Sequence, residues 1–166
     1  LISMDIHDFK IINSICGIIK GDETLKNIWR CIEKSLTSKD LAGHINADRF
    51  AIYCRCDDKD EVIECIHKIG EGLKDITEAL KIPNIIPYYG ISHWKHGKKV
   101  EEAYSEANFA KNQVKESKDI SYQFYSHEDT LKILENRAME DEFAGAISNG
   151  QFEIWYQPKY NPVDNK

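Results

Sequence analysis

His44-Ile45-Asn46-Ala47-Asp48-Arg49-Phe50-Ala51-Ile52-Tyr53-Cys54 carries the pattern of a tight turn followed by a β-strand. Phe50, Ile52 and Cys54 alternate with Ala51 and Tyr53, which places two sets of side chains on opposite faces of an extended segment. A second short run, residues 40–43, comes before the turn. Two short strands around a turn that contains asparagine predict a β-hairpin.

The segments around the hairpin alternate between strand and helix patterns. We expect strands at residues 1–6, 85–94 and 120–125, and helices at 8–15, 22–36, 59–82 and 100–116. The 59–82 helix is the clearest, because its apolar residues recur at steps of three and four and Pro83 ends it. Pro87 favours an edge or a bulge for its strand. The pattern predicts an α+β fold, with a central sheet that contains antiparallel strands and is flanked by helices.

Two runs before the hairpin resemble the opening of GGDEF domains, the family that includes the diguanylate cyclases. Met4-Asp5-Ile6-His7-Asp8-Phe9-Lys10-Ile11-Ile12-Asn13 is similar to the family's Asp-Ile-Asp-x-Phe-Lys-x-Ile-Asn motif. Gly17 and Gly21-Asp22-Glu23-Thr24-Leu25 are similar to its Gly-His-x-x-Gly-Asp-x-x-Leu motif. Asn46-Ala47-Asp48-Arg49-Phe50 then occupies the positions of the Gly-Gly-Asp/Glu-Glu-Phe signature in degenerate form. The resemblance covers residues 1–126 and implies the order β-α-α-β-β-α-β-α-β.

Residues 127–166 resemble the start of an EAL domain, the cyclic di-GMP phosphodiesterase family. A helix is expected at 128–149, Gly150 caps it, and an aromatic strand at 152–158 ends in Tyr-Gln-Pro. The resemblance implies one helix and one strand of a truncated TIM-like barrel, in which Gln157 would lie at the substrate site. We expect the helix to pack on the first domain or on a second copy. The strand is expected to be disordered or to pair with another sheet edge, because an isolated strand is unstable.

The resemblance implies a weak or vestigial metal site. Asp5, the carbonyl of Ile6 and Asp48 match the family's oxygen ligands, and hard cations such as Mg²⁺ or Mn²⁺ prefer such oxygens. Asp48 also matches the position used for base chemistry. Ala47 adds a Cβ where the signature has glycine, Asn46 is expected to accept the left-handed turn, and Arg49 reverses the charge of the acid at its position. Such a site is expected to be catalytically inactive.

Other positions imply nucleotide binding. Asn13 and Asp22 match the family's guanine-reading pair, and Lys115 matches its phosphate-binding lysine. The phosphate-binding arginine is replaced by Asp119, and the arginine of the product-inhibition motif before the hairpin is replaced by Thr37. A structural role is an equal alternative for the first pair, because Asp22 is also a good helix N-cap and Asn13 could cap locally.

Composition narrows the classes of function. A formal net charge of −6 over 166 residues argues against a nucleic-acid binder. No apolar run reaches the roughly 18 residues that span a bilayer, and no signal peptide is recognisable. The five cysteines show no zinc-like pairing and are expected to be reduced core thiols, which predicts a cytoplasmic location. The His93-x-x-His96 pair lacks nearby acids and is not expected to bind metal. Because Leu1 is not an initiator methionine, we expect the chain to be cut from a longer protein.

Three hypotheses remain open for the function. The first is an inactive GGDEF-like domain that regulates an EAL phosphodiesterase in the parent protein, either by binding GTP or by forming a homodimer. The second is a residual diguanylate cyclase that makes cyclic di-GMP from two GTP, and the third is a ligand-free interaction scaffold. Cyclic di-GMP would be a partner of the parent's EAL domain. No cofactor is required for the first role, and Mg²⁺ or Mn²⁺ would bind weakly, together with GTP.

Overall fold

The chain divides into two compact units, Leu1–Tyr125 and Ser126–Lys166. The structure, a computed structural model, describes residues 1–56, 58–114 and 121–157. Among the helices in these ranges, none has the length and the apolar character needed to cross a bilayer.

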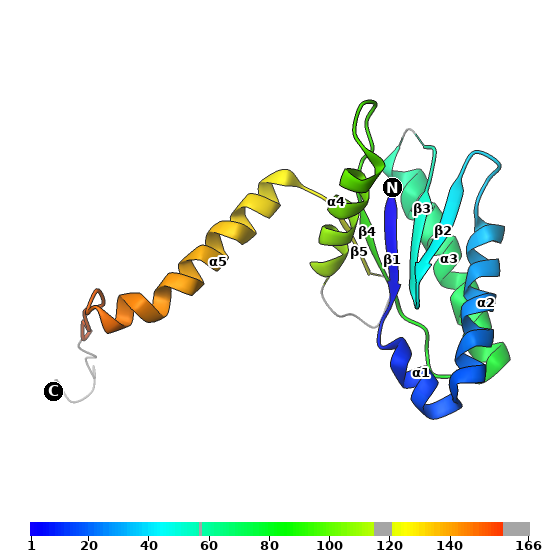
Figure 1. Cartoon of the computed structure of the whole chain (residues 1–166), viewed down its shortest axis with the longest axis horizontal. Coiled ribbons are helices and arrows are strands. Elements are labelled where there is room, and N and C mark those ends of the chain that lie inside the picture. The colour runs from blue at the N-terminus through cyan, green and yellow to red at the C-terminus, as the bar shows by residue number, and fades with distance from the viewer. Residues whose placement is uncertain (57, 115–120, 158–166) are drawn as a thin grey trace, which may run out of the picture. The chain divides into compact units, whose positions relative to one another are not determined.

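The first unit is built on a mixed β-sheet (Figure 1). Its strands in the described residues are β1 (Ile2–Ile6), β2 (Leu41–Asn46), β3 (Arg49–Tyr53), β4 (Pro87–Ile91) and β5 (Ser121–Phe124). They lie side by side in the order β2-β3-β1-β4-β5. β4 and β5 are parallel, and the other neighbours are antiparallel. The predicted hairpin is the β2–β3 pair, and the predicted α+β class is confirmed.

Helices cover both faces of this sheet (Figure 1). They are α1 (Phe9–Cys16), α2 (Ile18–Ser35), α3 (Lys59–Leu80) and α4 (Val100–Asn112). α4 packs on β1, β4 and β5, whereas α2 and α3 pack on each other across the opposite face. The order of the elements along the chain is the one expected from the sequence.

The core lies between the sheet and the α2–α3 layer. Met4 pairs with Phe50 on one side and with Tyr89 on the other, and all three side chains are fully buried. The next pair along the two strands, Ser3 and Gly90, lies toward the opposite face of the sheet, because successive residues of a strand alternate between faces. The buried apolar residues contributed by α2 and α3 are Ile28, Ile32, Val62, Ile66, Ile69 and Leu73.

The predictions for Asp22 and for Pro87 are wrong. Asp22 is no N-cap, because α2 begins at Ile18, directly after Gly17, whose φ of 83° is in the left-handed region. Asp22 therefore lies inside the first turns of the helix. Pro87 is not on an edge strand, because β4 lies between β1 and β5. Its position as the first residue of β4 explains how the sheet accepts a residue without an N–H.

Over its described residues, the second unit contains one helix, α5 (His127–Ser148), as predicted. Ser126 caps it, and its hydroxyl accepts from the amide of Asp129. The strand predicted at 152–158 is wrong over its described part, because residues 151–157 form no strand. An extended segment needs a partner strand for its backbone N–H and C=O groups. The prediction that α5 packs on the first unit or on a second copy stays a prediction.

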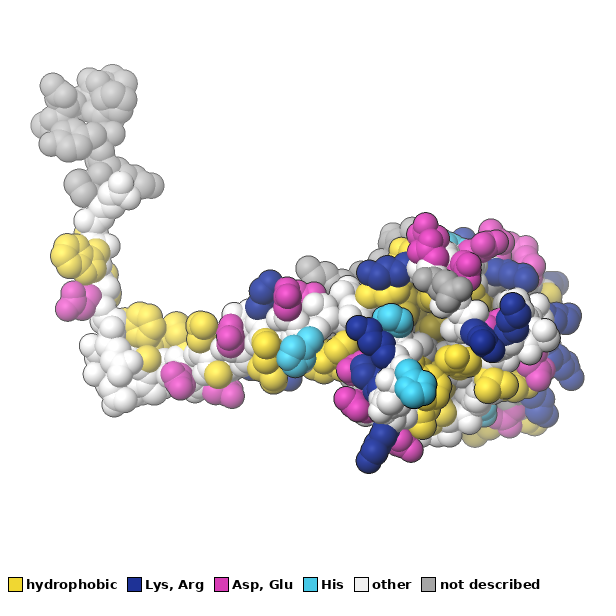
Figure 2. Space-filling view, turned by 90° about the horizontal axis from the view of Figure 1, so that it is seen from above, with side chains coloured by type: hydrophobic (Ala, Val, Ile, Leu, Met, Phe, Trp, Pro, Cys, Tyr) yellow, Lys and Arg dark blue, Asp and Glu magenta, His cyan; other side chains and the backbone are white. Residues whose placement is uncertain are grey.

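Apolar side chains on the second unit are exposed. Figure 2 shows them interspersed with acidic side chains along this part of the chain. The exposed large apolar residues of this unit are Leu131, Leu134, Met139, Phe143, Ile147, Phe152, Ile154, Trp155 and Tyr156.

We predict that Gly90→Ala destabilises the first unit by about 1–3 kcal/mol, the usual cost of overpacking. A Cβ at Gly90 would lie 1.9 Å from the backbone oxygen of Ala107 and 2.2 Å from the nitrogen of Lys111, so α4 would have to move away from β4. Gly43→Ala is the matched control, because a Cβ there meets nothing within 4 Å. Urea unfolding measures both variants. Equal stability of the two would contradict this account of α4 packing.

Candidate functional site: the hairpin turn and the end of β1

The turn of the β2–β3 hairpin adopts a strained backbone. Ala47 has φ 45°, in the left-handed region that costs an L-residue roughly 1–2 kcal/mol. Asn46 pairs with Arg49 across the turn, and the pairing shifts between His44 and Asn46. The His44 ring nitrogen Nε2 lies 2.7 Å from the carbonyl oxygen of Ala47. The expectation that Asn46 takes the left-handed turn is therefore wrong, because the irregular pairing places that conformation at Ala47.

The turn places Arg49 beside the carboxylate of Asp5 at the end of β1. The Arg49 Nε atom lies 3.6 Å from Asp5 Oδ2. The Lys111 ammonium, from α4, lies 2.7 Å from the same oxygen. The other carboxylate oxygen, Oδ1, accepts from the backbone N–H of Ile6 at 3.0 Å. Both oxygens of Asp5 thus have donors supplied by the protein.

Lys111 was missed by the sequence analysis, and it is the most buried of these charged groups. Its side chain is 6% exposed, against 22% for Asp5 and 52% for Arg49. The spacing of residues along α4 indicates that Lys111 is buried. Ala103, Ala107 and Lys111 recur every four residues, which puts a lysine on the same buried helix face as two alanines.

Asp48 lies close to this cluster. Burial raises the pKa of its carboxyl, and the neighbouring Asp5 carboxylate raises it further. A backbone hydrogen bond and the charge of Arg49 act in the opposite direction but do not cancel the rise. The turn, the end of β1 and α4 therefore bring together two acidic and two basic side chains.

The charges around Asp5 are unfavourable for a divalent metal ion. A hard cation needs several free oxygen ligands, and the two basic groups around Asp5 would repel it. Among residues 1–56, 58–114 and 121–157, no three His, Cys, Asp or Glu side chains are placed to hold a metal. His93 and His96 are both exposed.

Asn13 and Asp22 lie near each other where α1 meets α2. Gly21 has no side chain, and a Cβ there would lie 1.8 Å from the Asn13 side-chain oxygen. This close approach sets Asn13, which is half-buried, beside the turn of α2 that carries the exposed Asp22.

A groove of about 590 Å³ runs from Asp22 toward the hairpin. Its aromatic residues form a stack, with ring centroids 6.4 Å apart for Trp29 and Phe50 and 4.9 Å apart for His44 and Phe50. The other lining residues are Leu25, Lys26, Arg30 and Glu33. A flat heteroaromatic group with polar edges matches such a lining.

Asp40, which stands at the acidic position of the product-inhibition motif, accepts hydrogen bonds from nearby residues of the protein. Its Oδ2 accepts from the amide and the hydroxyl of Thr37, and its Oδ1 accepts from the amide of Arg55. Burial would raise the pKa of Asp40, but these hydrogen bonds outweigh it and hold the pKa below the ordinary value.

The predicted positions that remain are Lys115, Asp119 and Gln157. Lys115 and Asp119 lie outside the described residues. Gln157 is exposed in the second unit.

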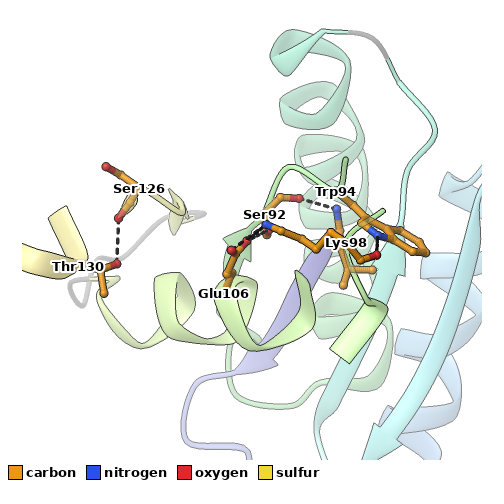
Figure 3. A network of polar contacts seen from close by, with 7 residues as sticks. Ser92, Trp94, Lys98, Glu106, Ser126 and Thr130 are labelled. Carbon is orange, nitrogen blue, oxygen red and sulfur yellow. Dashed lines mark hydrogen bonds and ion pairs between the residues drawn. The ribbon is translucent and has the colours of Figure 1, made fainter. Parts of the chain in front are cut away.

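A second ion pair holds the loop that leads into α4 (Figure 3). The Lys98 ammonium lies 2.7 Å and 2.6 Å from the two carboxylate oxygens of Glu106, and the Ser92 hydroxyl donates to the same carboxylate. The Trp94 indole N–H donates to the carbonyl of Lys98. These contacts anchor the first turns of the helix that carries Lys111. Figure 3 also shows the Thr130 hydroxyl donating to the carbonyl of Ser126 within the second unit.

Comparison with known proteins decides the family. Residues 1–120 match the family model described as diguanylate cyclase, GGDEF domain. The chain belongs to the GGDEF domain family. The fold agrees with that of the GGDEF domain of PA1120 (TpbB or YfiN) from Pseudomonas aeruginosa, with a TM-score of 0.68, 21% identity, and coverage of 81% of this chain and 80% of that one.

An EAL/GGDEF domain protein and a cyclic di-GMP phosphodiesterase are also similar to this chain. An EAL/GGDEF domain protein from M. capsulatus aligns with a TM-score of 0.65 and 25% identity, over 75% of this chain and 83% of that one. The cyclic di-GMP phosphodiesterase NbdA of Pseudomonas aeruginosa is 25% identical over 157 residues, which is 93% of this chain and 20% of NbdA. The chain spans only about a fifth of the length of the curated relatives that it matches over nearly its whole length.

We predict opposite pH dependences for Asp48 and Asp40. The folded-state pKa of Asp48 is raised, so its contribution to stability is full below the ordinary value of 3.8 and is lost as pH rises through the folded pKa. The folded-state pKa of Asp40 is lowered, so its contribution is present above 3.8 and is lost as pH falls through the folded pKa.

Urea unfolding between pH 2.5 and 7 measures these contributions by comparing the wild type with Asp48→Asn and with Asp40→Asn. With rising pH, the wild type should lose stability relative to Asp48→Asn and gain stability relative to Asp40→Asn. The same slope for both comparisons would contradict the assignment.

Proposed function

We propose that this GGDEF domain is catalytically inactive and that it regulates an EAL phosphodiesterase domain of the same protein. The observation that carries the proposal is the placement of the Lys111 ammonium 2.7 Å from Asp5 Oδ2. The Asp5 carboxylate is the group expected to bind metal, and its charge is already balanced inside the protein. Synthesis of cyclic di-GMP depends on metal at the GTP phosphates, and these residues do not provide the site for it.

The link to phosphodiesterase activity rests on the relatives and on the second unit. NbdA carries the name of a cyclic di-GMP phosphodiesterase, and its alignment covers 93% of this chain. We assign residues 127–166 to the beginning of an EAL domain, with Gln157 as a residue of its substrate site. The cytoplasm is the matching location, since cyclic di-GMP is made from GTP.

Nucleotide binding is the proposed regulatory input. The groove between α2 and the hairpin offers the rings of Trp29 and His44, which stack on the buried Phe50, as a surface for a purine. Asp22 offers a carboxylate for the N–H donors of guanine. Asn13 lies against Gly21 and supports the α2 turn from which Asp22 projects. We infer that GTP binds weakly here and without a divalent cation. Lys115 is the proposed phosphate contact.

We predict no diguanylate cyclase activity. Incubation of the full-length protein with GTP and Mg²⁺ or Mn²⁺, followed by chromatography, should give no cyclic di-GMP above the background without protein. An active relative assayed alongside shows that the conditions support the reaction. Product formed at a rate typical of cyclases and abolished by Asp48→Ala would contradict the proposal and favour the residual cyclase.

We predict GTP binding that is indifferent to metal and depends on Asp22. Calorimetry in excess Mg²⁺ and in EDTA should give the same affinity. Asp22→Asn should weaken binding about tenfold, the effect of losing roughly 1.4 kcal/mol from a charge-assisted hydrogen bond. In the full-length protein, GTP should change the rate of cyclic di-GMP hydrolysis, and Asp22→Asn should remove that effect.

The neighbouring carboxylate provides the matched control. Glu23 is exposed on the same turn of α2 but pairs with Lys20, so Glu23→Gln should leave the affinity unchanged. Equal weakening by both substitutions would place the guanine site elsewhere. No binding by the wild type would favour the ligand-free scaffold.

A further inference from the structure

Two cysteine thiols from different elements lie in contact on the edge of the first unit. Cys54 directly follows β3, and Cys65 is in α3. The Cys54 thiol donates to the Cys65 sulfur, with a sulfur–sulfur distance of 3.8 Å. Both side chains are half-buried, and all five cysteines of the chain are thiols.

The thiol pair borders a groove of about 260 Å³. This groove gives both sulfurs a path to small polar molecules. Its remaining lining residues are Ser35, Thr37, Asp40, Arg55, Cys56, Glu61, Glu64 and Lys68. No three metal-binding side chains converge here or elsewhere in the described ranges, so the thiols are placed as a pair rather than as a metal site.

The surroundings shift the pKa values of the two thiols in opposite directions. The hydrogen bond from Cys54 lowers the pKa of Cys65, and Lys68 acts in the same direction, against burial and the charge of Asp40. The same hydrogen bond, together with burial, raises the pKa of Cys54. Of the two sulfurs, Cys65 is therefore the one more readily present as a thiolate.

We propose that Cys54 and Cys65 form a modification site at which a small hydroperoxide converts the two thiols into a disulfide between the end of β3 and α3. The Cys65 thiolate attacks one peroxide oxygen. A sulfur–oxygen bond forms, the oxygen–oxygen bond breaks, and the leaving oxygen takes a proton to become water or an alcohol.

The second step closes the disulfide. The Cys54 sulfur attacks the sulfenic sulfur of Cys65, so the sulfur–sulfur bond forms and the sulfur–oxygen bond breaks. The hydroxide leaves with the Cys54 proton as water. Two electrons pass in total from the two thiols to the hydroperoxide, and a thiol reductant reverses the modification.

The experiment treats the full chain with one equivalent of hydrogen peroxide, blocks the remaining thiols by alkylation, and digests the protein with trypsin. Cleavage after Arg49, Arg55, Lys59 and Lys68 puts the three cysteines of this groove on separate peptides, residues 50–55, 56–59 and 60–68. Mass spectrometry should find peptide 50–55 joined to peptide 60–68 with the loss of two hydrogens. Dithiothreitol should remove this species.

Two variants and one comparison of rates test the assignment. Cys56→Ser should keep the linked pair, and Cys65→Ser should lose it. In the untreated wild type, iodoacetamide should label Cys65 faster than Cys31, which is also half-buried but whose pKa is raised by burial. A link between peptides 50–55 and 56–59, no intramolecular link, or slower labelling of Cys65 than of Cys31 would overturn the proposal.

Discussion

The charge and the availability of the Asp5 carboxylate at the candidate site depend on its ion pair with Lys111. A lysine ammonium that is 6% exposed is stable only with a charged partner, because the cost of removing it from water is large. Asp5 supplies that partner at the end of β1. The proposal that this domain is inactive rests on this pair, because it occupies the carboxylate that would otherwise be an open ligand for a divalent cation. The same contact holds α4 against the sheet.

The packing of α4 and the geometry of the hairpin support this pair from two sides. Gly90 lets the backbone of α4 approach β4 closely, which brings Lys111 within reach of Asp5. The loop before α4 is anchored by the Lys98–Glu106 pair. On the other side, the turn with Ala47 at φ 45° directs Arg49 toward the same carboxylate. Residues from three separate strands and helices therefore meet at one point.

The first unit carries two surfaces with different chemistry. The groove between α2 and the hairpin has an aromatic lining and is the proposed nucleotide site. The groove beside the start of α3 has thiols and charged groups and suits a small polar oxidant. Asp40 lies at the second groove, where its hydrogen bonds to Thr37 and Arg55 hold the loop next to Cys54. The two proposals concern separate surfaces, so each can fail without the other.

The sequence by itself determined the elements of this protein, because periodicity and turn residues are local properties. It predicted the hairpin from the alternation after Phe50, the long helix that ends before Pro83, and the order of strands and helices. The start of α2 was misplaced because the chain turns at Gly17 and the helix begins directly after it at Ile18, before Asp22. Only the tertiary structure decided the contacts of the site. Lys111 contacts Asp5 although the two are 106 positions apart in the sequence. Cys65 in α3 contacts Cys54 at the end of β3. Such pairings depend on how the helices pack on the sheet, which no local pattern records.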